Sequence, residues 1–310
     1  MNKSIRGRLA PSPSGYLHIG NLCSLLLAWL DVRALGGGLI FRMEDLDPAR
    51  SREEYARAMA EDLRWLGLDW DEGYPDARFC QSRRTALYEE AFESLKAREL
   101  VYPCYCSRAE RLAASAPQPG EPGHDPGCRC ARLSHKERQA LELAGRKPSW
   151  KIRVPDRDIR IDDAHYGLFT QNLARDVGDF ILRRADGVFA YQLAVTVDVA
   201  LMGISRVVRG RDLLDSSPRQ AWLTELLGAP RPAYAHGPLI LFDKRKMSKR
   251  LGDLSTARLR TAYSPEELVG ELASFLGLID RPEPLSAREL LPHFDWKKIT
   301  REDIPYENGS

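Results

Sequence analysis

Residues 5–20 read IRGRLAPSPSGYLHIG, and this stretch contains strand, loop and helix signals in that order. Polar and apolar residues alternate at its start, as in a half-buried strand, and the prolines and glycine that follow are typical of a loop. Apolar residues then recur at helical spacing from Leu17 to Leu35. A strand, a short loop and a helix open a parallel α/β sheet, in which ligands bind beyond the carboxyl ends of the strands.

Strands and helices continue to alternate along the first third of the chain. A second strand is predicted at 39–43, and Ser51 with Glu54 has the spacing of a capping box that opens a helix. A further helix is predicted at 83–98. We therefore predict that residues 1–100 form the first half of an α/β core.

The composition changes sharply near residue 101, where Pro, Gly, Ser and Cys become frequent. Such a segment contains too few apolar residues to fold around a core of its own. Strand signals return at 150–154 and in a hairpin at 180–191 that turns at Asp186-Gly187. We interpret residues 101–190 as an insert that divides the core.

The second half of the core is predicted at 191–245. It contains a helix at 192–202, a strand at 204–208 and a second helix, for which Ser217 is the expected N-cap and Pro218 the first helical residue. This order of elements repeats the α/β pattern of the first half.

Charge and hydropathy limit the class of protein. The 310 residues include 46 Lys and Arg against 44 Asp and Glu, so a polyanionic partner would need a local basic surface. The chain has no apolar run of the roughly 20 residues that span a bilayer, and its first residues lack the apolar region of a signal peptide. We expect a cytoplasmic monomer without membrane contacts.

Four of the six cysteines lie close together, with one histidine between the two pairs. They are Cys104, Cys106, Cys128 and Cys130, and the histidine is His124. In a reducing compartment, such clustering favours a metal ion over disulfides, and zinc prefers sulfur and nitrogen ligands in a tetrahedron. The alternative is a loop in which the cysteines are incidental.

The other unusual segment, Lys244–Arg250, places five cations around one serine. Taken alone, it is typical of a solvated basic turn or a nucleic-acid-binding patch. Together with the segment from Ser14 to Gly20, however, it resembles the two signatures of the class I aminoacyl-tRNA synthetases. The second histidine of the first signature is replaced here by Asn21.

The resemblance implies a Rossmann-type catalytic core that binds ATP with Mg²⁺. His18 would contact the ATP phosphates, Gly20 would pack beneath the adenine, and Lys249 would neutralise the charge that develops on the α-phosphate. The residues implied for ATP binding and catalysis are His18, Gly20, Lys246, Ser248 and Lys249.

A longer set of matches resembles the glutamyl branch of this class. It comprises residues 8–12, 42–50, 81–82, 191–194 and 208–210. The implied glutamate-binding residues are Arg8, Ala10, Ser12, Glu44, Tyr191 and Arg209. Arg8 or Arg209 would hold the side-chain carboxylate and Glu44 the ammonium group, because cations and an acceptor are what glutamate requires. The second of two adjacent acidic residues usual in relatives is replaced by Val199.

Within this branch the chain resembles the truncated paralogs, the glutamyl-queuosine tRNA(Asp) synthetases, because residues 246–310 are too few for an anticodon-reading domain and form only a short helical C-terminal part. The resemblance implies that glutamate is activated without tRNA and then transferred to queuosine in the anticodon stem-loop of tRNA(Asp). It also implies that the insert at 101–190 binds the RNA acceptor and contains zinc, in a module at about 104–130. The implied ligands are Cys104, Cys106, His124 and Cys128, with Cys130 as a spare or competing thiol.

Two other functions are compatible with the same residues. One is a minimal glutamyl-tRNA synthetase that charges the 3′ end of its tRNA. The other is a catalytically retired paralog that binds tRNA or an amino acid without turnover, although the presence of His18, Gly20, Lys246 and Lys249 argues against this.

Overall fold

The computed structural model describes residues 5–107, 128–242, 245–246 and 255–306. Its central strands are β1 (Arg6–Leu9), β2 (Gly38–Phe41), β3 (Glu72–Gly73), β6 (Asp158–Asp163), β7 (Gly167–Asn172), β9 (Arg206–Gly210) and β10 (Ala233–Gly237). β1 pairs with β2, and β9 with β10, in parallel. β1 also lies beside β9, because the Ser205 N–H donates to the Arg6 carbonyl over 2.9 Å.

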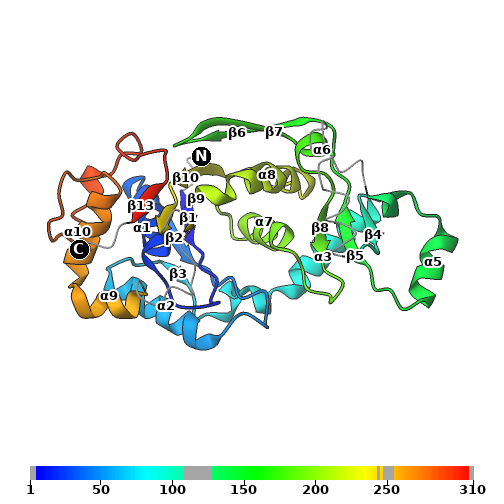
Figure 1. Cartoon of the computed structure of the whole chain (residues 1–310), viewed down its shortest axis with the longest axis horizontal. Coiled ribbons are helices and arrows are strands. Elements are labelled where there is room, and N and C mark those ends of the chain that lie inside the picture. The colour runs from blue at the N-terminus through cyan, green and yellow to red at the C-terminus, as the bar shows by residue number, and fades with distance from the viewer. Residues whose placement is uncertain (1–4, 108–127, 243–244, 247–254, 307–310) are drawn as a thin grey trace.

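The strands therefore follow the order β3-β2-β1-β9-β10-β6-β7 (Figure 1). In this order the first strand of each half of the core is central, as in the Rossmann fold. The predicted fold class, an α/β core with an insert, is confirmed. β6 lies within the predicted insert but pairs with the core strand β10, so the end of this sheet is built from insert residues.

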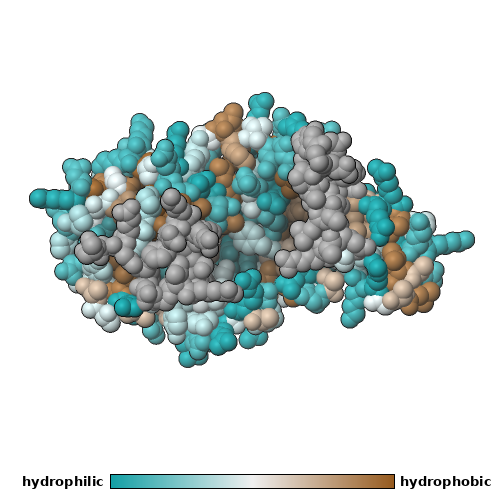
Figure 2. Space-filling model, viewed as in Figure 1, coloured by the Kyte–Doolittle hydropathy of each residue, from teal (hydrophilic) through white to brown (hydrophobic). Residues whose placement is uncertain are grey.

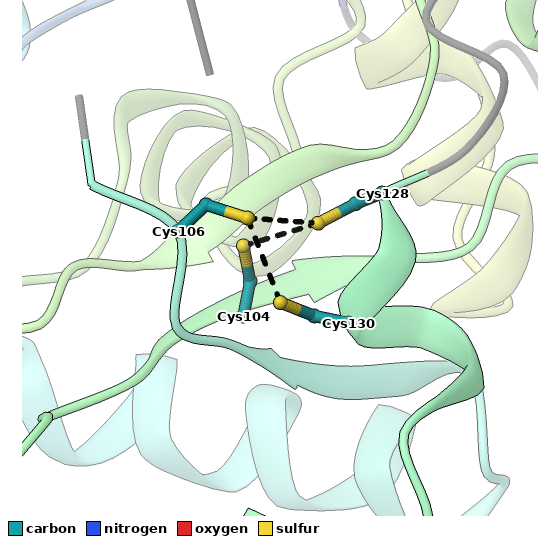
Figure 3. A group of neighbouring side chains, drawn as sticks. All are labelled: Cys104, Cys106, Cys128 and Cys130. Carbon is teal, nitrogen blue, oxygen red and sulfur yellow. Dashed lines mark hydrogen bonds between the residues drawn. The ribbon is translucent and has the colours of Figure 1, made fainter. Parts of the chain in front are cut away.

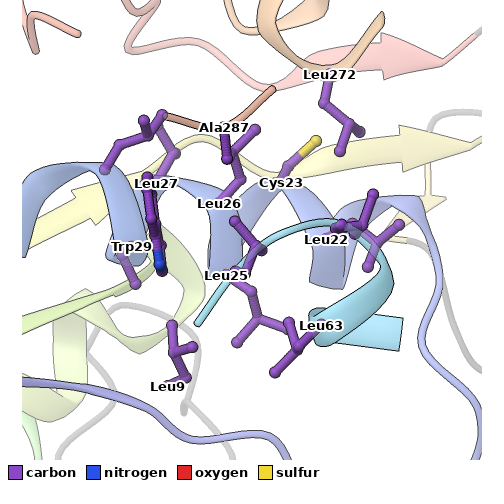
Figure 4. Close-up of a cluster of buried hydrophobic side chains, with 14 of the residues drawn as sticks. Leu9, Leu22, Cys23, Leu25, Leu26, Leu27, Trp29, Leu63, Leu272 and Ala287 are labelled. Atoms are coloured by element: carbon purple, nitrogen blue, oxygen red, sulfur yellow. The ribbon is translucent and has the colours of Figure 1, made fainter. Parts of the chain in front are cut away.

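Five helices cover the core: α1 (Ile19–Ala34), α2 (Glu53–Trp65), α3 (Thr85–Ala97), α7 (Tyr191–Leu201) and α8 (Ser217–Leu226). α1 is apolar on most of its faces because other elements surround it. Figure 4 shows Leu22 and Leu26 of α1 in a cluster that also includes Leu63 of α2 and Leu272 from the C-terminal part of the chain. Complete burial of one such leucine stabilises the fold by about 1.5–3 kcal/mol, so this cluster fixes the position of α1.

The insert has a separate antiparallel sheet in the order β4 (Val101–Cys104), β5 (Ser149–Ile152), β8 (Phe180–Arg183). Two helices accompany it, α5 (His135–Leu143) and the short α6 (Leu173–Asp176). Beside β4, a small buried cluster is formed by Tyr102, Cys104, Tyr105, Cys128 and Cys130. Figure 1 shows this part of the insert at the opposite end of the molecule from the C-terminal helices.

The C-terminal part contains α9 (Thr256–Ala262), α10 (Pro265–Phe275) and the strands β11 (Ile240–Phe242), β12 (Arg245–Lys246) and β13 (Ile304–Tyr306). β13 runs parallel to β11, and the Ile304 N–H donates to the Leu239 carbonyl over 2.8 Å. α9 is joined to the loop before α1, because the Thr256 N–H donates to the Leu17 carbonyl over 2.9 Å. The chain therefore returns to the edge of the core where the strands end.

Several local predictions were wrong. The helix expected to open with a Ser51 and Glu54 capping box begins at Glu53, and its N-cap, Arg52, makes no side-chain capping bond. The predicted N-cap Ser217 is instead the first residue of α8, and Ser216 occupies the cap position. The predicted hairpin at 180–191 does turn at Asp186-Gly187, with the antiparallel bridge Arg183 to Phe189, but it is short because α7 begins at Tyr191.

The face shown in Figure 2 is mostly hydrophilic, with apolar residues in small groups. Within the described residues, no helix combines the length and the apolarity needed to cross a membrane.

Candidate active site

A cavity of about 460 Å³ opens where the carboxyl ends of β1 and β9 diverge. This is the topological switch point of the sheet, at which open α/β folds bind their ligands. Its size is within the range of small-molecule sites. It is lined by Arg8, Ala10, Pro11, Ser12, Ser14, His18, Gly20, Asn21, Ser24, Leu25, Ala28, Glu44, Tyr191, Val208, Arg209, Gly210, Asp212, Leu213, Pro238, Leu239 and Ile240.

The N-terminus of α1 forms one wall of this cavity. His18 is the N-cap residue, with extended backbone, and its N–H donates to the Asn21 side-chain oxygen over 3.3 Å. Asn21, which replaces the family's second histidine, thus caps the helix reciprocally. A Cβ at Gly20 would lie 3.2 Å from the His18 ring. The free N–H groups and positive dipole end of a 16-residue helix suit a phosphate.

Arg8 projects from β1 and is almost fully buried. It donates to the carbonyl oxygen of Val208 on β9, and its Nε has no hydrogen-bond partner within the described part of the chain. Burial and the nearby guanidinium groups of Arg42 and Arg209 lower the pKa of Arg8 to about 10. It therefore stays charged at neutral pH and retains a donor for a ligand.

Arg209, on β9, is bound by the protein through all five of its N–H groups. Its Nε donates to His236 Nε2 over 3.1 Å, and one Nη donates to the Gln220 side-chain oxygen over 2.8 Å and to the Tyr191 hydroxyl over 3.4 Å. The other Nη donates to Ser217 Oγ over 2.8 Å and to the Leu213 carbonyl over 3.2 Å. The contact with Tyr191 is the longest, and both residues line the cavity.

Glu44 follows β2 and is held beside the loop after β1, because its N–H donates to the Pro11 carbonyl over 3.0 Å. Its carboxylate accepts a hydrogen bond from Arg42 over 2.7 Å. Arg42 is completely buried and lies 3.8 Å from the carboxylate of Asp198. Burial alone would lower the pKa of Arg42, but Glu44 and Asp198 raise it, so the cation is stable in the interior.

Asp198 is the centre of a second buried network. Its carboxylate accepts from Gln81 over 2.8 Å, from Arg84 over 2.6 Å and from the Tyr88 hydroxyl over 3.0 Å. Val199, where the resemblance predicts a second acidic residue, is buried in the apolar cluster around α7. In this chain the second position therefore contributes to packing.

The structure brings most of the predicted site residues together. Arg8, Ala10, Ser12, His18, Gly20, Glu44, Tyr191 and Arg209 all line the same cavity. Lys246 lies in β12, but the position of its side chain is not described, and Ser248 and Lys249 lie outside the described residues.

The sequence did not indicate which residues orient the side chains of the cavity. Arg42, with Asp198 near it, contacts Glu44. Gln220 and His236 accept from Arg209, and Asp163 contacts His236. Asp163 Oδ2 lies 2.6 Å from His236 Nδ1. Arg42 lay within the matched segment 42–50, but His236 and Asp163 gave no local signal, because His236 lies 27 residues from Arg209 and 73 residues from Asp163.

Four sulfur atoms converge in the insert (Figure 3). Cys104 and Cys106 lie 3.4 and 3.5 Å from Cys128, and Cys106 lies 3.6 Å from Cys130. All four sulfurs are within 4.8 Å of one another, close to the roughly 3.8 Å separation expected for thiolates around tetrahedral zinc. This donor set fits a zinc ion.

The position of Cys130 differs from the prediction. It was expected to be a spare thiol, but its sulfur is part of the group. His124, the predicted fourth ligand, lies outside the described residues. Burial, together with hydrogen bonds to Cys128 and Cys130, raises the pKa of Cys106, and a bound cation would reverse this by stabilising the thiolates.

Comparison with known proteins identifies similar chains. Residues 4–294 match the family described as tRNA synthetases class I (E and Q), catalytic domain. The chain is 48% identical to a glutamyl-Q tRNA(Asp) synthetase of Symbiobacterium thermophilum, over 96% of this chain and 94% of the relative. It is 45% identical to one of Nocardia farcinica, over 98% of this chain and 94% of the relative.

Solved structures show the same architecture. The crystal structure of a glutamate-tRNA synthetase from Elizabethkingia anophelis superimposes with a TM-score of 0.83 and 27% sequence identity. The match covers 98% of this chain and 68% of that protein. A glutamate tRNA ligase from Elizabethkingia meningosepticum, in complex with its amino acid, gives a TM-score of 0.82 at 27% identity, over 98% of this chain and 67% of that protein.

Proposed function

The chain belongs to the glutamyl-Q tRNA(Asp) synthetases, within the class I tRNA synthetases, and we propose that its cavity converts glutamate and ATP into glutamyl-adenylate. The enzyme then transfers glutamate to the queuosine base of tRNA(Asp). Because ATP and tRNA are both cytoplasmic, it acts in the cytoplasm.

The observation that carries this proposal is the charge arrangement of the cavity. Two guanidinium groups, Arg8 and Arg209, and one carboxylate, Glu44, line the same space. Glutamate has two carboxylates and one ammonium group, so its charges complement those of the cavity. Charged groups recognise each other best where water is excluded, and both arginines are buried.

The hydrogen bonds suggest different roles for Arg8 and Arg209 in binding glutamate. Arg8 lines the cavity, and among the described residues its guanidinium donates to one acceptor, the Val208 carbonyl, so it is the group best able to form new bonds to a substrate carboxylate. Arg209 has a fixed orientation, and its 3.4 Å contact with the Tyr191 hydroxyl is the one that a carboxylate can most easily join or replace. Glu44, set in place by Arg42, would receive the ammonium group.

Activation needs no proton transfer from the protein. The α-carboxylate of glutamate is already ionised, and one of its oxygens attacks the α-phosphorus of ATP while the bond to pyrophosphate breaks. His18 and the N-terminus of α1 would stabilise the negative charge on the phosphates. Mg²⁺ would accompany ATP, and Lys246, Ser248 and Lys249 are proposed, by resemblance, to complete the phosphate site.

Transfer to queuosine is supported by the relatives that match this chain over nearly all of their length. The glutamate-tRNA synthetase structure is matched over 68% of its length, so charging of a tRNA 3′ end is the weaker alternative. Both acceptors offer a vicinal diol. A hydroxyl of that diol would attack the carbonyl carbon of the adenylate, and AMP would leave.

The insert is proposed to contain one structural zinc ion held by Cys104, Cys106, Cys128 and Cys130. Zinc would join the strand β4 to the residues that follow Cys128, two segments whose shared apolar cluster is small. His124 is the alternative fourth ligand.

The direct test measures glutamate-dependent ATP–pyrophosphate exchange without tRNA, followed by transfer of radiolabelled glutamate to tRNA with and without queuosine. We expect exchange with glutamate alone and label on the anticodon fragment after nuclease digestion. Label on the 3′-terminal fragment would favour the minimal glutamyl-tRNA synthetase. Absence of exchange with any amino acid would favour the retired paralog.

A further inference from the structure

A buried chain of polar groups leads from the back of the sheet to Arg209. Asp163 at the end of β6, His236 on β10 and Arg209 on β9 lie on three neighbouring strands, and His236 is in register with Arg209. His236 is 0% exposed and Asp163 is 2% exposed. Neither residue lines the cavity, so neither can touch the substrate directly.

The hydrogen bonds determine where the imidazole proton lies. The Asp163 carboxylate accepts the backbone N–H groups of His165 and Tyr166 over 3.0 and 2.9 Å, and it lies 2.6 Å from His236 Nδ1. Because an ionised carboxylate only accepts, Nδ1 carries the proton. Nε2 is then an acceptor, as the Arg209 Nε–H requires. Burial lowers the pKa of His236, which favours this neutral form.

Every acceptor that holds Arg209 is electrically neutral. These acceptors are an imidazole nitrogen, an amide oxygen, two hydroxyls and a backbone carbonyl. The amide of Gln220 is itself oriented, because its nitrogen donates to the Gln192 side-chain oxygen over 2.9 Å. A carboxylate at any of these positions would neutralise the guanidinium, but neutral acceptors fix its orientation and leave its charge available.

We propose that Asp163, His236 and Gln220 are positioning residues that determine the preference of the site for an amino acid with a carboxylate side chain over one with an amide. They act through Arg209, by holding its guanidinium in place without cancelling its charge. Asp163 keeps the proton of His236 on Nδ1, so that Nε2 can accept from Arg209. The imidazole ring of His236 separates the negative charge of Asp163 from Arg209. This inference rests on the proposed function, since it assumes that Arg209 faces the amino acid side chain.

The sharpest test compares two substitutions at one position. Gln220→Glu adds a negative charge 2.8 Å from Arg209 with little change of shape, whereas Gln220→Met removes the acceptor without adding charge. ATP–pyrophosphate exchange is measured with the full chain at varied glutamate, glutamine and ATP. We expect Gln220→Glu to lower the preference for glutamate over glutamine by about tenfold or more, and Gln220→Met to lower it less. The KM for ATP should stay near that of the parent.

His236 offers an independent comparison. His236→Phe removes the acceptor and should raise the KM for glutamate, whereas His236→Gln, whose side-chain oxygen can accept from Arg209, should restore most of the affinity. His165→Phe is the matched control, because His165 is also buried but is bonded to the Thr300 carbonyl rather than to Arg209. In an Arg209→Ala background, His236→Phe should cause no further loss of preference.

Two results would overturn this inference. One is an unchanged preference in Gln220→Glu. The other is a parallel rise in the KM for glutamate and for ATP in the His236 variants, which would indicate a merely structural role. If the parent enzyme itself shows no glutamate-dependent exchange, the proposed function fails and the inference fails with it.

Discussion

The amino acid cavity and the cysteine cluster are built in opposite ways. The cavity combines side chains from residue 8 to residue 240, which come from strands and helices of the core and from the loops that join them. The cluster draws four sulfurs from residues 104 to 130, beside a small apolar group. The cavity is therefore a product of the whole fold, whereas we expect the order of the cluster to depend on the zinc ion that we propose it holds.

The same contrast appears in how charge is managed. In the core, carboxylates of the protein compensate the charge of the buried Arg42, which pairs with Glu44 and lies near Asp198. In the insert, the four sulfurs face one another, and thiolates so close together require a metal cation. Removal of metal should consequently disorder the insert and leave the cavity in the core unchanged.

The largest effect is expected from a zinc chelator. Because zinc contributes roughly 10–16 kcal/mol in small structural sites, its removal should expose the insert around Cys106 to proteolysis and abolish transfer to tRNA. Exchange with glutamate alone should persist. Metal analysis and mapping of the cleavage sites would check this. Freshly purified protein without zinc would contradict the proposed zinc site. Equal loss of exchange and transfer would show that the cavity also depends on the metal.

Substitution at Cys130 sharpens the comparison by testing the fourth ligand. Cys130→Ser should weaken zinc binding by more than the roughly 10- to 100-fold typical of losing an outer partner of a metal ligand. Cys23→Ser is the control, because Cys23 is buried in the core cluster away from the insert. Zinc affinity would be measured by competition with a chelator. If Cys130→Ser leaves the zinc affinity unchanged, His124 would be the fourth ligand instead of Cys130.

In the core, the corresponding loss is that of Asp198. Asp198→Ala leaves the partly buried Arg84 without its carboxylate partner and the buried Arg42 with Glu44 alone, which should lower the free energy of unfolding by about 3–5 kcal/mol. Urea denaturation would measure this, with the exposed turn residue Asp186 replaced by Ala as a control. A loss no greater than that of Asp186→Ala would show that the network contributes little to stability.

The smallest effect should come from the cavity itself. Arg8→Ala removes one charged hydrogen bond to glutamate, which should raise the KM for glutamate by the equivalent of about 1.5–3 kcal/mol. Stability should change little, because the backbone pairing of β1 with β2 and the burial of Leu9 hold the strand in place. The control is Arg6→Ala, on the same strand, where Arg6 pairs with Glu72 on the surface. Equal KM values for the two variants in exchange kinetics would remove Arg8 from the substrate site.

Much of the fold could be predicted because its signals are local. The strand, loop and helix of residues 5–35 follow from hydropathy spacing and from Pro and Gly, and β1 and α1 lie where expected. The caps were less predictable. Ser217 looked like an N-cap, but its hydroxyl bonds to Arg209, because a buried guanidinium competes successfully for a nearby acceptor.

The amino acid sequence by itself predicted residues that the structure brings together around one cavity. Arg8, His18, Glu44 and Arg209 could be assigned from short motifs, since groups that must touch a ligand occupy loop and strand ends whose pattern is local. The pairs of cysteines were equally visible.

Only the tertiary structure decided which buried residues form hydrogen bonds to one another and orient the cavity residues. Asp163 reaches His236 across 73 residues, and Gln81 reaches Asp198 across 117. It also decided that Cys130 joins the sulfur group and that Val199 packs in the core. A buried polar residue needs a partner, but the sequence does not say which one, because strand order and register bring distant residues together. The orientation and charge of Arg209 are therefore properties of the folded sheet.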